Sequence, residues 1–202
     1  MEIRKLKVYD TQQFCDLIIN MYSHLNNLEW FTPMPFDFDT VKSIIENPRF
    51  YIIGAFENDE LCGVSSLDYK CGKLIGKISF PKNCDTSKLV EIGFNIVHTN
   101  HRGKKIMQTL IGELLLKLKT DNFEWVFTKV HDDNIASNKS FFNKEFKFFC
   151  HYKKEVDKKD FKSLSNEIFF CQEGKQNAIK ALEKFKNSDY IVVNYSILIK
   201  QL

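Results

Sequence analysis

Residues 89–152 alternate between short apolar runs and amphipathic helical patterns, and this alternation narrows the choice of fold more than any other feature of the chain. Three apolar runs have the length and composition of buried strands, at 89–97, 124–130 and 146–152. A long helical pattern that opens at Gly103 and a shorter one over 134–144 separate these runs. Strands and helices in this order are typical of an α/β domain, in which we expect the neighbouring strands to run parallel.

The residues before 89 add strands of a different kind. Apolar runs at 50–56 and 61–69 are joined by Glu57-Asn58-Asp59-Glu60, which is typical of a hairpin, so we expect an antiparallel pair here. Further upstream, the pattern predicts a strand at 3–8, a helix capped by Asp10 or Thr11, a loop at 30–38, and a short helix that begins at Asp39 and ends before Pro48.

The segment after 152 is less regular. A charged run at 153–162 is expected to be a solvated loop. It is followed by a predicted short strand at 166–171, an amphipathic helix at 175–187 and a closing strand at 190–199. No internal repeat or low-complexity linker divides the chain. We therefore predict one α/β domain over residues 1–202, with a mixed central β-sheet flanked by helices.

The composition argues against several classes of protein. A formal charge of +3 and a pI near 8.4 are mild for a nucleic-acid-binding domain, so we expect no nucleic-acid partner; a small anionic ligand would account for the positive charge. No apolar run approaches the roughly 20 residues of a membrane span, and the first residues do not resemble a signal peptide. We expect a cytoplasmic protein without a membrane partner, and the sequence leaves open whether it forms a homodimer.

The six cysteines lie at 15, 62, 71, 84, 150 and 171, form no C-x-x-C pair, and have no histidine at metal-ligand spacing. Only Cys150 has a histidine as its neighbour, and adjacent residues on a strand point to opposite faces. We therefore expect reduced, mostly buried thiols and no metal site.

The segment between the strand at 89–97 and the long helix has the features of an anion-binding loop. No acidic residue lies between 92 and 112. Gly103 would let a phosphate approach the backbone at the positive end of the helix dipole. The positive side chains here are those of Arg102, Lys104 and Lys105. The spacing matches neither G-x-x-x-x-G-K-[ST] nor G-x-G-x-x-G, which disfavours a nucleoside triphosphate or NAD. A basic first turn that merely faces solvent is the alternative, but such charges oppose the helix dipole and so imply a bound anion.

This segment resembles the signature V-x-P-x-x-R-G-x-G of the GCN5-related N-acetyltransferase family. Val97, Arg102 and Gly103 match the signature, whereas Thr99 stands at the proline and Lys105 at the last glycine. The resemblance implies that acetyl-coenzyme A is the co-substrate, and the spacing of the cysteines and histidines gives no reason to add a metal. It places the residues that bind the cofactor at Arg102, Gly103, Lys104 and Lys105.

A second pattern of the family, N-x-x-[AS]-x-x-x-Y-x-x-x-G-F, is similar to the run of Asn134, Ser137, Phe141, Glu145 and Phe146. The resemblance implies that Asn134 contacts coenzyme A. It also implies that Phe141 lies at the cofactor in place of the tyrosine that protonates the departing thiolate. The last strand of the family's fold would then be 195–200, and 153–187 would be an insertion before it.

Glu91 is the candidate general base. It lies six residues before Val97, the spacing that the resemblance to family members acting on histones implies, and residues at even separations on a strand share a face. Burial would raise the pKa of its carboxyl, as a base for an ammonium requires. The alternative is a charge in water at the entry of the strand. Asp132 and Asp133 are reserve candidates, and His101 is expected to be a surface residue.

The family resemblance also implies the remaining parts of the chemistry. Backbone N–H groups near Ile96 and Val97 would hold the oxyanion of the tetrahedral intermediate. With Phe141 in place, the thiolate leaves unprotonated, takes a proton from water, or receives one from Tyr152 or Tyr195.

The sequence thus predicts an acetyl-CoA-dependent N-acetyltransferase that acts on an amine of a small molecule or a protein, with the identity of the acceptor left open. The alternative is a non-catalytic acyl-CoA-binding module with a degenerate site, for which Lys105 and Phe141 are the evidence. A nucleic-acid-binding domain is disfavoured, because neither basic segment interleaves aromatic residues for base stacking.

Overall fold

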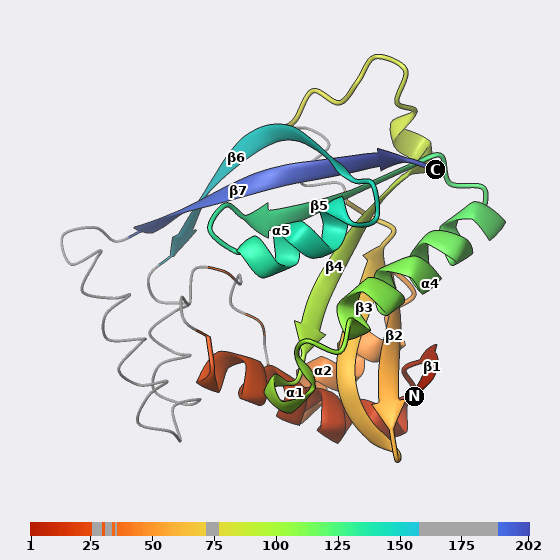
Figure 1. The fold of residues 1–202 in the computed structure, drawn as a ribbon, viewed down its shortest axis with the longest axis vertical. Helices are drawn as coiled ribbons and strands as arrows, with labels where there is room; N and C mark the ends of the chain where they lie inside the picture. The colour runs from red at the N-terminus through yellow and green to blue at the C-terminus, as the bar shows by residue number, and fades with distance from the viewer. Residues whose placement is uncertain (26–29, 31–33, 35, 72–76, 158–189) are drawn as a thin grey trace.

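In the described part of the chain, seven strands form one mixed sheet in the order β1-β2-β3-β4-β5-β7-β6 (Figure 1). The structure is a computed structural model and describes residues 1–25, 30, 34, 36–71, 77–157 and 190–202. The strands are β1 (Glu2–Lys5), β2 (Phe50–Glu57), β3 (Glu60–Asp68), β4 (Leu89–Val97), β5 (Trp125–His131), β6 (Lys147–Asp157) and β7 (Tyr190–Gln201). The α-helices of the described residues are α1 (Thr11–Ser23), α2 (Phe38–Glu46), α4 (Ile106–Thr120) and α5 (Ile135–Phe142). The predicted α/β fold with a mixed, helix-flanked sheet is therefore confirmed.

The sheet combines an antiparallel half with a parallel junction. Strands β1 to β4 pair antiparallel in sequence order, and the predicted hairpin is present, with Asn58 and Asp59 in its turn at φ +52° and +64°. Strands β4 and β5 are parallel, as the alternation predicted. The short helix expected from Asp39 begins one residue earlier, at Phe38, because the Asp37 carboxylate accepts a hydrogen bond from the backbone N–H of Thr40 at 2.9 Å.

The position of β6 differs from the prediction. We expected the strand at 146–152 to lie beside β5, but β7 lies between them and runs antiparallel to both. Ile197 and Leu198 of β7 are fully buried in clusters on opposite faces, which suits a central strand. By contrast, β6 carries Lys153 and Lys154, and lysines are typical of edge strands.

The charged run after 152 is also partly corrected. Strand β6 continues to Asp157, so residues 153–157 pair with residues 190–194 of β7 and do not form the solvated loop that we expected. The rest of that run, the strand predicted at 166–171 and the helix predicted at 175–187 lie outside the described residues.

Two predicted element boundaries differ from those in the structure because of the local backbone conformation. Helix α4 begins at Ile106 and not at Gly103, because Gly103 and Lys105 have φ angles of +81° and +61°, which a right-handed helix excludes. The first strand ends at Lys5 and not at residue 8, because Val8–Asp10 forms a 3₁₀-helix, η1.

The sheet is covered on both faces by apolar clusters. On one face α1 and α2 pack over a cluster that includes Phe14, Ile18 and Ile52. On the other face α4 and α5 pack over a cluster that includes Ile53 and Leu114. Adjacent Ile52 and Ile53 belong to different clusters because successive side chains on a strand alternate between faces. Among the described helices, none combines the length and the hydropathy that a membrane-spanning helix needs.

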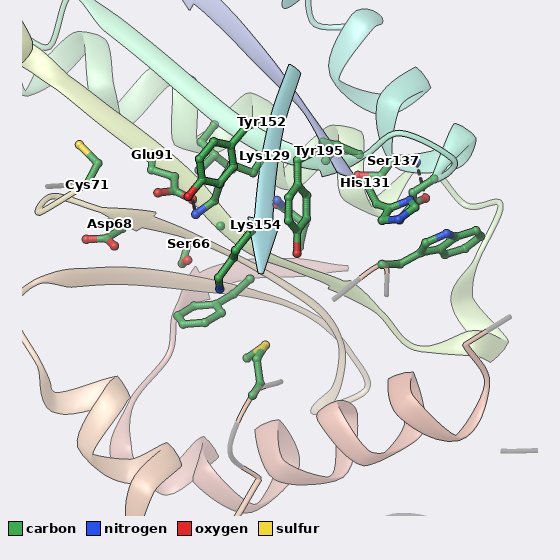
Figure 2. Close-up of a pocket in the computed structure, with 18 of the residues that line it drawn as sticks. Ser66, Asp68, Cys71, Glu91, Lys129, His131, Ser137, Tyr152, Lys154 and Tyr195 are labelled. Carbon is green, nitrogen blue, oxygen red and sulfur yellow. Dashed lines mark hydrogen bonds and ion pairs between the residues drawn. The ribbon is translucent and has the colours of Figure 1, made fainter. Parts of the chain in front are cut away.

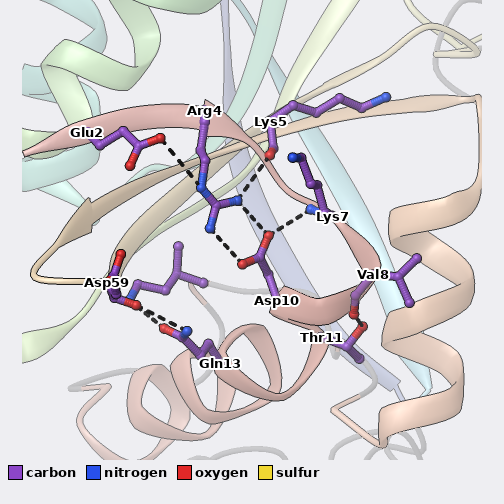
Figure 3. A network of polar contacts seen from close by, with 10 residues as sticks. Glu2, Arg4, Lys5, Lys7, Val8, Asp10, Thr11, Gln13 and Asp59 are labelled. Carbon is purple, nitrogen blue, oxygen red and sulfur yellow. Dashed lines mark hydrogen bonds and ion pairs between the residues drawn. The ribbon is translucent and has the colours of Figure 1, made fainter.

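A polar network fixes the junction between β1 and α1 (Figure 3). The buried carboxylate of Asp10 accepts hydrogen bonds from the guanidinium of Arg4 at 2.7 and 2.8 Å and from the backbone N–H of Lys7 at 2.7 Å. Burial acts to raise the pKa of Asp10, but these bonds and the charge of Arg4 outweigh it and hold that pKa below its usual range. The network therefore sets the direction in which the chain enters α1.

Candidate functional site

Strands β4 and β5 separate after a short paired stretch. Their pairing runs from Leu89–Trp125 to Glu91–Phe127, after which the hydroxyl of Thr128 donates to the carbonyl of Ile92 at 2.9 Å. Beyond this point β4 carries a bulge, marked by Phe94 at φ +47° and a register shift against β3. The bulge turns β4 away from β5, and the two strands diverge toward their carboxyl ends (Figure 1).

A pocket of about 1040 Å³ lies along this divergence. Its lining includes residues of β2 to β7 and of the start of α5, and Figure 2 shows 18 of the lining side chains. The groups with acid–base chemistry among them include Asp68, Glu91, Lys129, His131, Tyr152 and Tyr195. Apolar walls with a few convergent titratable groups are typical of a binding or catalytic site.

Glu91 lies inside the pocket and not in open water. Its side chain is 12% exposed, and its carboxylate lies 2.7 Å from the ammonium of Lys129 on β5. Burial raises the pKa of Glu91, and the nearby Lys129 charge opposes this without reversing it. Glu91 thus has the raised pKa that the sequence analysis expected, on a partly buried side chain, while its catalytic role stays a prediction.

Three further residues of the pocket were not singled out from the sequence. Arg49 makes two hydrogen bonds to the carboxylate of Asp68, at 2.7 and 2.5 Å. Ser66 is 1% exposed, and its hydroxyl has no hydrogen-bond partner among the described residues. A buried hydroxyl of this kind is suited to bind a polar group of a ligand.

The reserve carboxylates lie elsewhere. Asp132 accepts a hydrogen bond from the hydroxyl of Ser196 at 2.7 Å and lies 3.4 Å from His151. Neither Asp132 nor Asp133 is among the residues that line the pocket. Tyr152 and Tyr195, by contrast, both line it, from the paired strands β6 and β7.

The predicted anion-binding loop connects β4 to α4. It contains a short 3₁₀-helix, η4 (Thr99–His101), followed by four exposed residues, Arg102, Gly103, Lys104 and Lys105. A Cβ at Gly103 would have no neighbour within 4 Å, so the loop is open on this side. The first N–H groups of α4 point into the loop without helical partners, as at every helix N-terminus.

The departures from the family signatures have structural explanations. Thr99, which stands at the signature proline, exchanges two hydrogen bonds with the side chain of Asn20 of α1, at 3.0 and 3.2 Å. Lys105 and Glu145 stand at signature glycines and have φ angles of +61° and +64°. Both positions thus keep the left-handed backbone that favours glycine, at a modest conformational cost.

Of the remaining predicted residues, Asn134 lies at the pocket and Phe141 does not. Asn134 lines the pocket and caps α5, its side-chain oxygen accepting from the N–H of Ser137 at 3.1 Å. Ile96 and Val97 lie on β4 opposite Val64 and Gly63. Phe141 is fully buried in the cluster beneath α4, with its ring edge-on to Phe146 at 5.1 Å, and is not among the pocket-lining residues.

His101 is less exposed than predicted. Its side chain is 18% exposed and lies between Glu57, at 3.2 Å, and the thiol of Cys62, at 3.7 Å. The described cysteines are free thiols, of which Cys15, Cys62 and Cys71 are buried, as expected.

Comparisons with known proteins agree with the fold and with the sequence signatures. The chain matches the model of the acetyltransferase (GNAT) family over residues 13–148, which contain β4, the loop, α4 and α5. No curated protein sequence matches the chain significantly.

Solved structures of several acetyltransferases share the fold at low sequence identity. A ribosomal-protein-alanine N-acetyltransferase from Brucella melitensis superposes with a TM-score of 0.67 at 15% identity, with 100% of both chains covered. An N-acetyltransferase from Staphylococcus aureus Mu50 has a TM-score of 0.65 at 16% identity, covering 99% of this chain and 97% of that chain. A phosphinothricin acetyltransferase from Sinorhizobium meliloti, in complex with acetyl-CoA, has a TM-score of 0.62 at 13% identity, covering 100% and 88%.

The structural likeness establishes the shared fold, and the family model covers more than half of the chain. The chain therefore belongs to the GNAT family of acetyltransferases.

Proposed function

We propose that this protein is an N-acetyltransferase that moves the acetyl group of acetyl-CoA onto an amine, with Glu91 as general base. The observation that carries the proposal is the position of Glu91, a partly buried carboxylate with a raised pKa in the pocket where β4 and β5 diverge. A base for an ammonium requires such a group. The same pocket reaches Asn134 at the start of α5.

The cofactor would bind across the loop and the divergence. Arg102, Lys104 and Lys105 supply positive charge for the pyrophosphate, and the N-terminus of α4 supplies backbone donors. The pantetheine arm would then run between β4 and β5, where the strands no longer pair with each other. N–H groups near Ile96 and Val97 would stabilise the oxyanion.

The acyl transfer follows from these positions. An acceptor amine arrives mainly as an ammonium, and Glu91 removes its proton so that the nitrogen can attack the thioester carbonyl. The tetrahedral intermediate collapses by expelling the coenzyme A thiolate, which takes a proton from a nearby phenol, and the nitrogen loses its extra proton to the phenolate to give the neutral amide. Tyr152 and Tyr195 are the candidates, because both line the pocket that holds Glu91, whereas Phe141 carries no proton donor. Lys129 would orient the carboxylate of Glu91 for proton removal from the acceptor.

The competing hypothesis is an acyl-CoA-binding module without turnover, which Phe141 and Lys105 would allow. Release of free coenzyme A thiol from acetyl-CoA, measured over a panel of small amines, amino acids and peptides, separates the two. We expect transfer to at least one amine. We also expect Glu91→Gln to bind acetyl-CoA like the parent while losing about 10² or more in rate. A parent protein that binds acetyl-CoA and acetylates no amine would favour the module.

A further inference from the structure

Three residues from separate segments meet beside the anion-binding loop. Glu57 ends β2, Cys62 lies on β3, and His101 ends η4. One ligand atom from each lies within 4.8 Å of the others, and no other described residues form such a group. Cys62 and His101 are far apart in the sequence and come together only through the pairing of β3 with β4. The sequence alone therefore did not indicate this cluster.

The spacing of the sulfur and nitrogen atoms suits a tetrahedral metal ion. With Zn–S near 2.3 Å and Zn–N near 2.0 Å, two ligands of one tetrahedral zinc lie about 3.6 Å apart. The Sγ of Cys62 lies 3.7 Å from the Nε2 of His101. The carboxylate of Glu57 lies 3.2 Å from Nδ1, the other ring nitrogen of His101, so its side chain, which is 44% exposed, would have to rotate to reach a cation held by Cys62 and Nε2.

We propose that Glu57, Cys62 and His101 bind a thiophilic divalent cation of the zinc class, with water at the fourth position. Thiolate and imidazole ligands select zinc and cobalt over magnesium and calcium, which prefer oxygen. The cation would tie the loop that begins at His98 to the β2–β3 hairpin. Because the site uses only residues of this chain and no acetyl-CoA, it does not depend on the proposed function.

The groups around the three residues are compatible with binding of a cation. Cys62 is 1% exposed and donates its S–H to the carbonyl of Glu60 at 3.3 Å, so it is shielded from bulky electrophiles. Metal binding would displace its proton and form the thiolate. The ammonium of Lys104 now lies 3.1 Å from the Glu57 carboxylate; its side chain is 52% exposed and can turn away into solvent.

Cobalt is the probe that tests the proposal, because its spectrum reports thiolate ligation. The full chain, stripped of metal, is titrated with Co²⁺, and we expect one equivalent to produce a thiolate charge-transfer band and tetrahedral d–d bands. Zn²⁺ should displace the cobalt and raise the Tm, while Mg²⁺ should do neither. Absence of the charge-transfer band in the folded parent would overturn the proposal and leave only a contact between the Cys62 sulfur and the His101 ring.

Matched variants locate the site. Cys62→Ala and His101→Gln should each abolish the band, and Glu57→Gln should weaken cobalt binding at least about tenfold, since a charged ligand is lost. The controls are Cys15→Ala, another buried thiol, and His151→Gln, another histidine beside a carboxylate, both of which should keep the band. If Cys62→Ala fails to fold, the loss of the cobalt band in His101→Gln tests the site instead. A band that persists in His101→Gln, or is lost in the controls, would contradict this assignment.

Discussion

The carboxylate of Glu91 lies 2.7 Å from the ammonium of Lys129, on the neighbouring parallel strand and inside the pocket. Two effects act on Glu91 in opposite directions, because burial raises its pKa and the positive charge lowers it, with burial the larger. Because its pKa is raised, Glu91 binds a proton more tightly than an ordinary glutamate does and keeps it to a higher pH. The pair therefore suits proton abstraction from an ammonium.

The pH dependence of acetyl transfer should report Glu91. Because a general base must be deprotonated, kcat/KM should rise with pH through a pKa above the ordinary value of glutamate, about 4.3. Measuring kcat/KM across the acidic range with one acceptor checks this. In Glu91→Gln the limb that belongs to Glu91 should vanish and leave only titration of the acceptor amine.

Lys129→Met serves as the paired control for this profile. Removal of the positive charge should raise the pKa of Glu91 further and move the acidic limb to higher pH. An acidic limb that stays in place in Glu91→Gln, with unchanged rate, would show that another group is the base.

Gly103→Glu should strongly weaken acetyl-CoA binding while the protein stays folded. Gly103 has φ +81° and nothing within 4 Å of its Cβ position, so a side chain there meets strain but no clash. The added carboxylate would repel the pyrophosphate, and we expect at least a tenfold loss of affinity by calorimetry. Gly103→Asn is the control, because asparagine tolerates the left-handed backbone and carries no charge. Equal acetyl-CoA affinity in Gly103→Glu and the parent would mean that the pyrophosphate binds elsewhere.

Phe141→Tyr tests the missing proton donor. A restored phenol that reaches the thiolate should raise kcat by up to about 10² with little change in acetyl-CoA affinity. Because Phe141 is fully buried against Phe146, the extra oxygen should also lower the free energy of unfolding by about 1 to 3 kcal/mol. Single-turnover kinetics and chemical denaturation measure the two effects. A folded variant with unchanged single-turnover rate would assign the proton to another group, and Tyr152→Phe would then be the next variant to measure.

Asp10→Asn should destabilise the protein by about 2 to 3 kcal/mol at neutral pH, because it leaves Arg4 without its buried carboxylate. The pKa of Asp10 is lowered by folding, so its contribution is fully present above its unfolded pKa, near 3.9, and is lost as pH falls through the folded value. Denaturation of parent and variant at neutral and acidic pH should show the gap closing on acidification. Glu2→Gln is the control, since the Glu2 side chain is 64% exposed and lies 3.7 Å from the same arginine. A gap that stays constant with pH would show that the charge of Asp10 is not its source.

Local patterns predicted most of the elements because their causes are local. The apolar run of β4 and the three- and four-residue spacing in α4 and α5 follow from burial of one strand or one helix face. The order β5-β7-β6 was not predicted, since strand neighbours depend on the packing of the whole sheet. The predicted start of α4 was wrong because Lys105 has a left-handed backbone, which a lysine in the sequence does not predict.

Part of the candidate site was predicted from the sequence, since Asn134, Tyr152 and Tyr195 were named there and line the pocket together with Glu91. Glu91 and the loop at 98–105 follow from spacing along one stretch of chain. Lys129, Ser66 and the Arg49–Asp68 pair join the pocket through strand register, which the sequence does not encode locally.

The effect of acetyl-CoA on thermal unfolding is the measurement on which the proposed function most depends. A ligand that binds only the native state stabilises it, by about 2.7 kcal/mol at a hundredfold excess over Kd. For a chain of this size the predicted result is a rise in Tm of about 5 to 10 °C. ATP and NAD at the same concentration should give a clearly smaller rise. An unchanged Tm at millimolar acetyl-CoA, or an equal rise with ATP, would contradict an acetyl-CoA site on this protein.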